Sequence, residues 1–230
     1  MLTLDRIELA QGTFRLRADF NVEAGARVAI IGPSGAGKST LLAAVAGFLS
    51  PAGGRVRWND TDLTDLDPGA RPLSIIFQDN NLFPHLSAAQ NVGLGLRPSL
   101  RLTEAERERV TQSLDRVGLT GMANRKPAAL SGGQQSRVAL ARALLRDKPL
   151  MLLDEPFAAL GPGLKAEMLD LVAEIATEKA ATVLMVTHDP KDAERLAEQT
   201  ILVADGIAHA PQDTSRLLAD PPKVLRDYLN

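Results

Sequence analysis

The sequence contains no cysteine, only one tryptophan and one tyrosine, and no long apolar run. The missing cysteine excludes disulfide bonds, thiol nucleophiles and cysteine-ligated zinc or iron–sulfur centres. No stretch approaches the ~20 apolar residues of a membrane-spanning helix. The N-terminus also lacks the basic and apolar regions of a secretory signal. We therefore expect a globular protein of the cytosol.

The sequence also has no marked excess of positive or negative charge, because it contains 26 lysines and arginines and 28 aspartates and glutamates. A formal net charge of -2 provides no broad basic face, so nucleic acid is not expected as a partner. The 230 residues are enough for one domain with its own core. We predict a single domain over 1–230, in which 211–230 is a short tail.

Apolar patterns predict an α/β fold. From Phe14 to Val22 every second residue is apolar, which is typical of a strand with one wet face. Continuous apolar runs predict further strands, buried on both faces, at 28–31, 73–77, 150–153 and 182–186. The pair Asp205-Gly206 predicts a hairpin turn. Strands that alternate with helices indicate a parallel sheet covered by helices.

The middle of the chain has a different pattern. Residues 87–146 contain no convincing strand, whereas Thr103 and Glu106 form a capping box that begins a helix. Gly118 is expected to end that helix. We therefore predict an α-helical subdomain at about 87–146, inserted into the α/β core.

A phosphate-binding loop of the pattern G-x-x-x-x-G-K-[ST] follows the apolar run 28–31. Its backbone N–H groups and the N-terminus of the following helix, expected over 39–48, would hold the phosphates of ATP. Lys38 would reach the β- and γ-phosphates, and Ser39 would ligate Mg²⁺. The predicted ATP-binding residues are Gly32, Pro33, Ser34, Gly35, Ala36, Gly37, Lys38, Ser39 and Thr40.

Two carboxylates, Asp154 and Glu155, directly follow the apolar run 150–153. In a parallel sheet the carboxyl ends of the strands border the ligand site, so this pair is expected beside the phosphate loop. Asp154 would hold Mg²⁺, and Glu155 would orient or deprotonate the attacking water. A strand-end acid alone is a weak signal, but here it accompanies the phosphate loop.

A second anion-binding element is predicted at Leu130, Ser131, Gly132, Gly133 and Gln134, where a hydroxyl and two glycine N–H groups begin a helix. This LSGGQ sequence resembles the signature of the ATP-binding subunits of ABC transporters. The resemblance implies a head-to-tail homodimer with two ATP molecules at its interface. In that arrangement the signature of one subunit closes over the ATP on the phosphate loop of the other.

Other landmarks of that family occur in order. Gln78 resembles the Q-loop glutamine, which touches Mg²⁺, and His188 resembles the switch histidine, which contacts the γ-phosphate. The resemblance extends from residue 1 to about 210. It implies a P-loop NTPase with a RecA-like parallel sheet core, an N-terminal antiparallel β region and the inserted α-helical subdomain. The implied catalytic residues are Glu155, His188, Gln78 and Lys38, and the implied metal ligands are Ser39, Gln78 and Asp154.

Within that family, residues 77–96 are most similar to the ATPases of bacterial thiamine importers. The implied partners are two transmembrane permease subunits and a periplasmic substrate-binding protein, with the ATPase peripheral on the cytoplasmic face of the inner membrane. The segment 79–96, which carries Phe83 among several apolar residues, is expected to receive the permease; the alternative is that its apolar side chains fill the seam between the subdomains. Alternatives are importers of iron(III) or polyamines, a soluble non-transport ABC ATPase, and a P-loop metabolite kinase.

The sequence departs from the family pattern in three places. Directly after the signature, Gln135-Ser136-Arg137 replaces the more usual pairing with an arginine at position 136. The other two departures are single residues. Gln11 stands near the place of an aromatic residue that stacks on adenine; Phe14 is the alternative, although its alternating pattern favours a core position. Gly161 stands where the family usually has an aspartate that links the two ATP sites across the dimer. We expect weaker coupling between the sites from this change.

Overall fold

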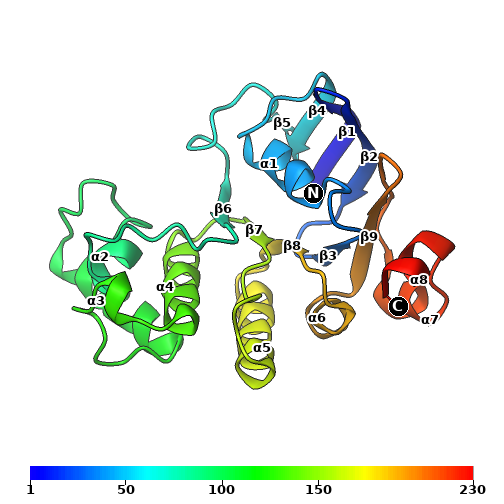
Figure 1. Ribbon diagram of the computed structural model, residues 1–230. Helices are drawn as coiled ribbons and strands as arrows, with labels where there is room; N and C mark the ends of the chain where they lie inside the picture. Colours follow the sequence, from blue (N-terminus) through cyan, green and yellow to red (C-terminus); the bar gives the residue numbers. More distant parts are fainter. Residues whose placement is uncertain (230) are drawn as a thin grey trace.

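The N-terminal strands form because their apolar side chains share one face. In the computed structural model, which describes residues 1–229, β1 (Leu2–Gln11) and β2 (Phe14–Val22) form an antiparallel pair. A β-bulge shifts the register between Leu4 and Ile7. β1 also pairs with β4 (Gly53–Trp58), and β4 with the short β5 (Thr61–Asp62). This antiparallel region confirms the prediction for the N-terminal part of the fold (Figure 1).

A parallel sheet forms the centre of the molecule. Its strand order is β9-β3-β8-β7-β6, and these strands span, in chain order, Arg27–Ile31 (β3), Leu73–Ile76 (β6), Leu150–Asp154 (β7), Thr182–Val186 (β8) and Gln199–Ala204 (β9). β10 (Ile207–Ala208) pairs with both β9 and β2 and so joins the parallel and antiparallel regions. The hairpin turn at Asp205-Gly206 is confirmed, since both residues have positive φ.

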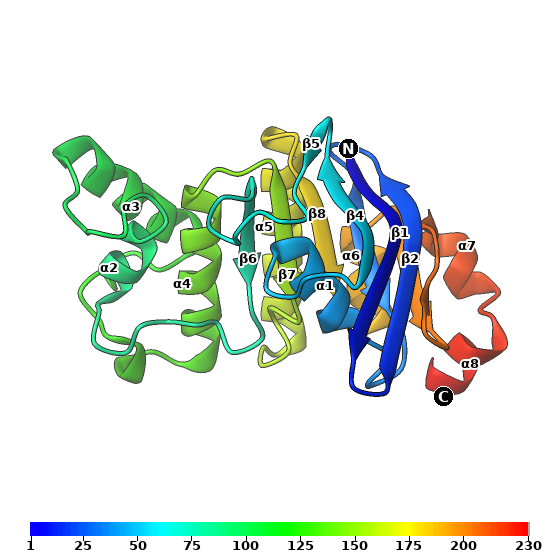
Figure 2. The same cartoon turned by 90° about the horizontal axis from the view of Figure 1, so that it is seen from above.

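One face of the parallel sheet packs on α1 (Lys38–Ala46). Val28 and Ile30 of β3 share an apolar cluster with Leu41 and Val45 of α1 and with side chains of the antiparallel strands. The helix therefore lies between the two sheet regions, and most of its residues are buried (Figure 2). It ends at Ala46 rather than at the predicted residue 48, because Gly47 takes the left-handed C-cap conformation.

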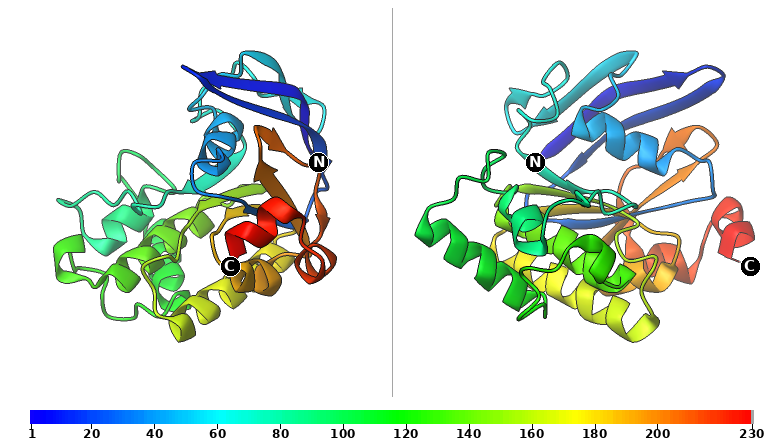
Figure 3. Two further views of the ribbon diagram at one scale, coloured as in Figure 1. Left: turned by 45° about the vertical axis from the view of Figure 1, so that its right-hand side comes forward. Right: turned by 60° about the vertical axis from the view of Figure 1, so that its left-hand side comes forward.

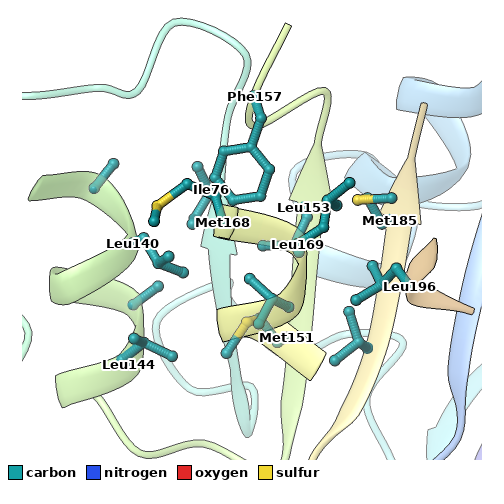
Figure 4. Close-up of a cluster of buried hydrophobic side chains, with 14 of the residues drawn as sticks. Ile76, Leu140, Leu144, Met151, Leu153, Phe157, Met168, Leu169, Met185 and Leu196 are labelled. Carbon is teal, nitrogen blue, oxygen red and sulfur yellow. The ribbon is translucent and has the colours of Figure 1, made fainter. Parts of the chain in front are cut away.

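The opposite face of the sheet is covered by α4 (Gly132–Leu145), α5 (Pro162–Glu178) and α6 (Pro190–Leu196). Figure 4 shows how this second cluster interdigitates: Met151, Leu153 and Met185 come from the strands, and Leu140, Leu144, Met168, Leu169 and Leu196 from the helices. Because successive strand residues point to opposite faces, both faces of β7 and β8 are buried. This burial explains why their sequences are continuous apolar runs.

Helices occupy the predicted middle region. α2 (Ala88–Gly93), α3 (Glu104–Arg116), the 3₁₀ turn η1 (Pro127–Ala129) and α4 contain all the regular structure of residues 87–146, and no strand occurs there. The Thr103 capping box and the left-handed Gly118 are both observed. Figures 1 and 2 show α2 and α3 on one side of the molecule, joined to the sheet through α4.

The C-terminal segment contains structure that its sequence does not predict. The short β11 (Gln212–Asp213) pairs with β9, and α7 (Thr214–Ala219) and α8 (Lys223–Leu229) follow. They lie at the end of the molecule opposite α2 and α3 (Figure 3). Asn230, the last residue of the predicted tail, lies outside the described residues. Among residues 1–229, no helix is long and apolar enough to cross a membrane.

Candidate active site

The phosphate loop begins where β3 ends, and two of its glycines are required by close contacts. Gly32 has φ +150°, and a Cβ there would lie 2.0 Å from the carbonyl oxygen of Val203 in β9. Gly37, the N-cap of α1, has φ +104°, and its Cβ would lie 2.5 Å from Cζ of Phe14. A side chain at either position would displace its neighbour, so the loop shape depends on glycine.

Lys38 is only 8% exposed although it carries a charge. Its ammonium group donates hydrogen bonds to the carbonyls of Gly32 at 2.8 Å and Pro33 at 3.0 Å, so the side chain folds back along the loop. Burial lowers the pKa of Lys38, while the charges of Glu155 and Asp154 act in the opposite direction. The loop therefore holds a desolvated positive charge beside its exposed tip, Ser34 and Gly35. Thr40 follows, half-buried, in the first turn of α1.

The end of β7 meets the start of α1 through Asp154 and Ser39. The Ser39 hydroxyl donates a hydrogen bond to Oδ1 of Asp154 at 2.9 Å. Burial raises the pKa of Asp154, and the neighbouring charge of Glu155 raises it further, against the lowering effects of Ser39 and Lys38. The pair offers a hydroxyl and a carboxylate, the oxygen donors that Mg²⁺ prefers.

Glu155 and His188 face each other across neighbouring strands. Oε2 of Glu155 lies 3.0 Å from Nδ1 of His188, which comes shortly after β8. Glu155 has φ +45°, a strained conformation for a residue other than glycine. Its backbone N–H donates to the carbonyl of Val186, which anchors the strained residue to β8. The carboxylate is thus positioned by its backbone and by the imidazole.

A network around Lys165 supports the segment that carries His188. Lys165 in α5 lies 2.7 Å from Oδ2 of Asp189 and 2.8 Å from Oδ1 of Asp192. Thr187 donates to the other oxygen of Asp192 at 2.8 Å. Sequence reasoning missed Lys165, because no local motif relates it to Asp189 and Asp192, which lie more than twenty positions later.

Gln78 follows β6 and is exposed, so its predicted metal contact stays a prediction. The predicted residues Lys38, Ser39, Asp154, Glu155 and His188 all lie at the carboxyl ends of β3, β7 and β8, adjacent strands of one sheet. Adjacent parallel strands bring such residues together, which is the usual location of a ligand site in this architecture.

The signature residues lie elsewhere. Ser131 is the N-cap of α4 and forms a reciprocal capping box with Gln134, while Ser131 and Gly132 are exposed and Leu130 is buried. Gly133 belongs to the same first turn. Within the part of the chain that is described, no hydrogen bond or ion pair joins residues 130–134 to the phosphate loop. The two predicted anion-binding elements are therefore separate within one chain.

Of the three departures from the family pattern, Gln11 and Gly161 are exposed, whereas Ser136 of the third is buried in α4. Gln11 ends β1 and is paired with Phe14 across the first hairpin. Phe14 is half-buried: it packs on the apolar cluster, as its alternating pattern predicts, and also lies against Gly37 of the phosphate loop. Gly161 is the N-cap of α5, and among residues 1–229 no heavy atom beyond its chain neighbours lies within 4 Å of the position that a Cβ would take.

Comparison with known proteins gives concordant likenesses. The family model described as "ABC transporter" matches residues 16–158. The "Thiamine import ATP-binding protein ThiQ" of Cereibacter sphaeroides is 63% identical over 229 residues, covering 100% of this chain and 99% of that protein. The protein of the same name from Ruegeria sp. (strain TM1040) is 55% identical with the same coverage.

Two solved structures are similar along nearly their whole length. They are titled "Dimeric Structure of MJ0796, a Bacterial ABC Transporter Cassette" and "Dimeric structure of a post-hydrolysis state of the ATP-binding cassette MJ0796 bound to ADP and Pi", with TM-scores of 0.83 and 0.82. Each is 33% identical and covers 93% of this chain and 99% of its own. With the family match over more than half of the sequence and the full-length relatives, these likenesses show that the chain belongs to the ATP-binding proteins of the ABC transporter family.

Proposed function

We propose that this chain is the ATP-hydrolysing subunit of an ABC importer for thiamine or thiamine pyrophosphate. The observation that carries the ATPase part is the convergence of Lys38, Asp154, Glu155 and His188 at one edge of the parallel sheet. Support for the substrate comes from the relatives, since a thiamine import protein shares 63% of its residues with this chain over the full length. We also propose that 1–230 acts as one ATP-binding domain.

Catalysis in this proposal is mainly positioning and charge stabilisation. The loop N–H groups and Lys38 bind the β- and γ-phosphates. Glu155 orients a water molecule and accepts its proton as the water oxygen attacks phosphorus, and ADP leaves with the bond to the γ-phosphate broken. His188 contacts the γ-phosphate and holds the Glu155 carboxylate through the 3.0 Å contact.

Mg²⁺ fits the oxygen donors at this edge. Ser39 and Asp154 would hold the ion, with Gln78 as a further ligand. Mg²⁺ is commonly bound through one or two carboxylates plus phosphate oxygens and water, and Asp154 supplies one such carboxylate here. When bound, the ion supplies positive charge to the β- and γ-phosphate oxygens.

The active unit in this proposal is a head-to-tail homodimer. The exposed signature residues Ser131 and Gly132 would contact the ATP on the phosphate loop of the second copy. Both similar solved structures are titled as dimeric, which supports this arrangement. Two permease subunits and a periplasmic binding protein complete the importer, and the ATPase would be peripheral on the cytoplasmic face of the inner membrane.

The ATPase assignment is tested with Glu155→Gln. This variant should bind ATP normally, form an ATP-dependent dimer and lose turnover by at least about a hundredfold. Thr111→Ala, an exposed change on α3, serves as a matched control. Undiminished hydrolysis by Glu155→Gln would contradict the role of that carboxylate.

The substrate is tested separately, in proteoliposomes that contain the ATPase, its permease subunits and the binding protein. ATP-driven uptake is measured for thiamine, iron(III) and spermidine in parallel. We expect uptake of thiamine alone. Uptake of either competitor instead would replace the substrate assignment while leaving the ATPase assignment intact.

A further inference from the structure

The loop that follows Gln78 is bound to α4, the helix that begins at the signature. Arg142 of α4 donates from Nη1 to the carbonyl of Asn81 and from Nη2 to the carbonyl of Asn80, both at 2.8 Å. Both asparagines are in the left-handed region, with φ of 59° and 44°, which asparagine tolerates better than most residues. One guanidinium therefore holds two consecutive carbonyls of the loop.

A second contact joins the same loop to the first turns of α4. The Asn80 side chain donates from Nδ2 to the Ser136 hydroxyl at 3.2 Å, and that hydroxyl donates to the carbonyl of Gly132 at 3.3 Å. Ser136 is only 2% exposed, and Oδ1 of Asn80 is buried with no partner among residues 1–229. The buried chain of contacts ends on the backbone of the signature itself.

An arginine that only filled space at position 142 would be energetically unfavourable. Burial lowers the pKa of its guanidinium, and no carboxylate pairs with it within the described part of the chain. Its charge is met by the two loop carbonyls instead. Arg142 is half-buried, and a partly desolvated charge without an ion-pair partner carries a cost that its hydrogen bonds must offset. The contact with the loop is therefore the feature that accounts for an arginine here.

We propose that Arg142, together with the Asn80–Ser136 contact, is a positioning device that makes the Gln78 loop and the signature move as one body. The two contacts act on one helix, about 16 Å of rigid backbone from Ser131 to Arg142. The inference rests on the proposed function and deepens it. Since the signature serves the ATP of the second copy, the device passes a displacement of the Gln78 loop in one subunit to the nucleotide bound by its partner.

The test uses the ATP-dependent dimer of the Glu155→Gln protein. Two quantities are measured: the affinity of the monomer for a fluorescent ATP analogue, and the ATP concentration that gives half-maximal dimer. Arg142→Gln should change the affinity of the monomer for the ATP analogue by less than twofold. It should raise the ATP concentration that gives half-maximal dimer about tenfold, which is equivalent to about 1.4 kcal/mol. Arg142→Lys keeps the charge but not the two-pronged geometry, so it should fall between the two.

Arg146→Gln is the matched control, because Arg146 caps the end of α4 and makes no hydrogen bond to 78–81 in the described structure. If Arg142→Gln does not fold, Ser136→Ala breaks the second contact and should raise the same ATP concentration about threefold. Equal behaviour of the Arg142 and Arg146 variants, or a parallel loss of monomer affinity, would overturn the proposal. Absence of a dimer in Glu155→Gln alone would instead refute the proposed function.

Discussion

Asp154 accepts a hydrogen bond from the Ser39 hydroxyl across 2.9 Å, which fixes the end of β7 to the start of α1. Burial nevertheless raises the pKa of Asp154, so the ionised carboxylate is less favourable in the folded chain than in the unfolded chain. In the proposed function this destabilisation accompanies the role of the carboxylate as a ligand of Mg²⁺. The effect of Asp154 on the free energy of unfolding therefore depends on pH.

We expect Asp154→Asn to raise the melting temperature of the nucleotide-free protein at pH 7. The folded chain holds the Asp154 proton more tightly, so its contribution to stability is greatest below the ordinary aspartate pKa and is lost as pH rises through the raised value. The difference between wild type and variant should therefore shrink in acid. Thermal melts at several pH values measure this. Magnesium-dependent nucleotide binding should weaken in the same variant, and a lower melting temperature at pH 7 would contradict the argument.

A second prediction concerns Gln11, which faces Phe14 in the first hairpin, on the same side as the buried Leu9 and Leu16. An aromatic ring at position 11 would lie beside Phe14, whose ring already contacts Gly37 of the phosphate loop. Stacking of an aromatic side chain on a nucleic-acid base contributes about 1–3 kcal/mol. We therefore expect Gln11→Tyr to tighten ATP binding by about tenfold.

Titration calorimetry with ATP and with triphosphate alone separates this effect from phosphate binding. The gain in Gln11→Tyr should appear only with ATP, and Gln11→Leu provides the non-aromatic control. Phe14→Ala should weaken ATP binding if Phe14 is the present adenine contact. If the ATP affinity is unchanged in both Gln11→Tyr and Phe14→Ala, the adenine binds elsewhere.

Sequence patterns predict the parallel strands well because burial on both faces leaves a continuous apolar run, as in β7 and β8. β4 was missed because only Val56 and Trp58 of its six residues are buried, between exposed or half-buried arginines. The segment containing α7 and α8 was missed because its three prolines favour irregular structure. Elements with a clear apolar run, a regular alternation or a recognisable cap could be predicted, and those without such a pattern could not.

The site divides in the same way. Lys38, Ser39, Asp154 and Glu155 lie within short motifs, so the chemistry of each can be predicted locally. Lys165 and Arg142 contact residues 24 and 61–62 positions away, respectively. Their roles arise only when α5 and α4 pack beside the segments that they hold. Contacts of this kind require the fold, which no single motif contains.

A third prediction follows from the ion pairs of Lys165. Its hydrogen bond is the main cause of the lowered pKa of Asp189, so the pair stabilises the fold above the ordinary aspartate pKa and less as pH falls through the lowered value. Lys165→Met should reduce the free energy of unfolding by about 1–3 kcal/mol at neutral pH. Urea titrations at pH 7 and in acid measure this loss, which should diminish in acid. Lys191→Met, on the exposed side of the same segment, should change little.

The last prediction concerns Phe83, which is 48% exposed in the loop between Gln78 and α2. The loop itself is held by Asn91, a fully buried side chain that accepts from the Phe83 N–H and donates to the carbonyls of Phe83, Leu86 and Ser87. All four bonds go to backbone atoms. Phe83→Ala therefore removes an exposed ring without removing what shapes the loop.

Exposed apolar side chains on such a fixed loop are typical of a docking surface, and the proposed permease is the partner that fits. We expect Phe83→Ala to leave ATP hydrolysis by the free subunit within twofold and to reduce ATP-driven thiamine uptake in proteoliposomes by about tenfold or more, as for loss of a buried aromatic anchor. Ile207→Ala is the control, because Ile207 is similarly exposed (45%) but lies on β10. A docking residue is expected to affect uptake but not hydrolysis by the free subunit. If Phe83→Ala leaves uptake unchanged, or reduces hydrolysis together with uptake, the ring does not serve docking.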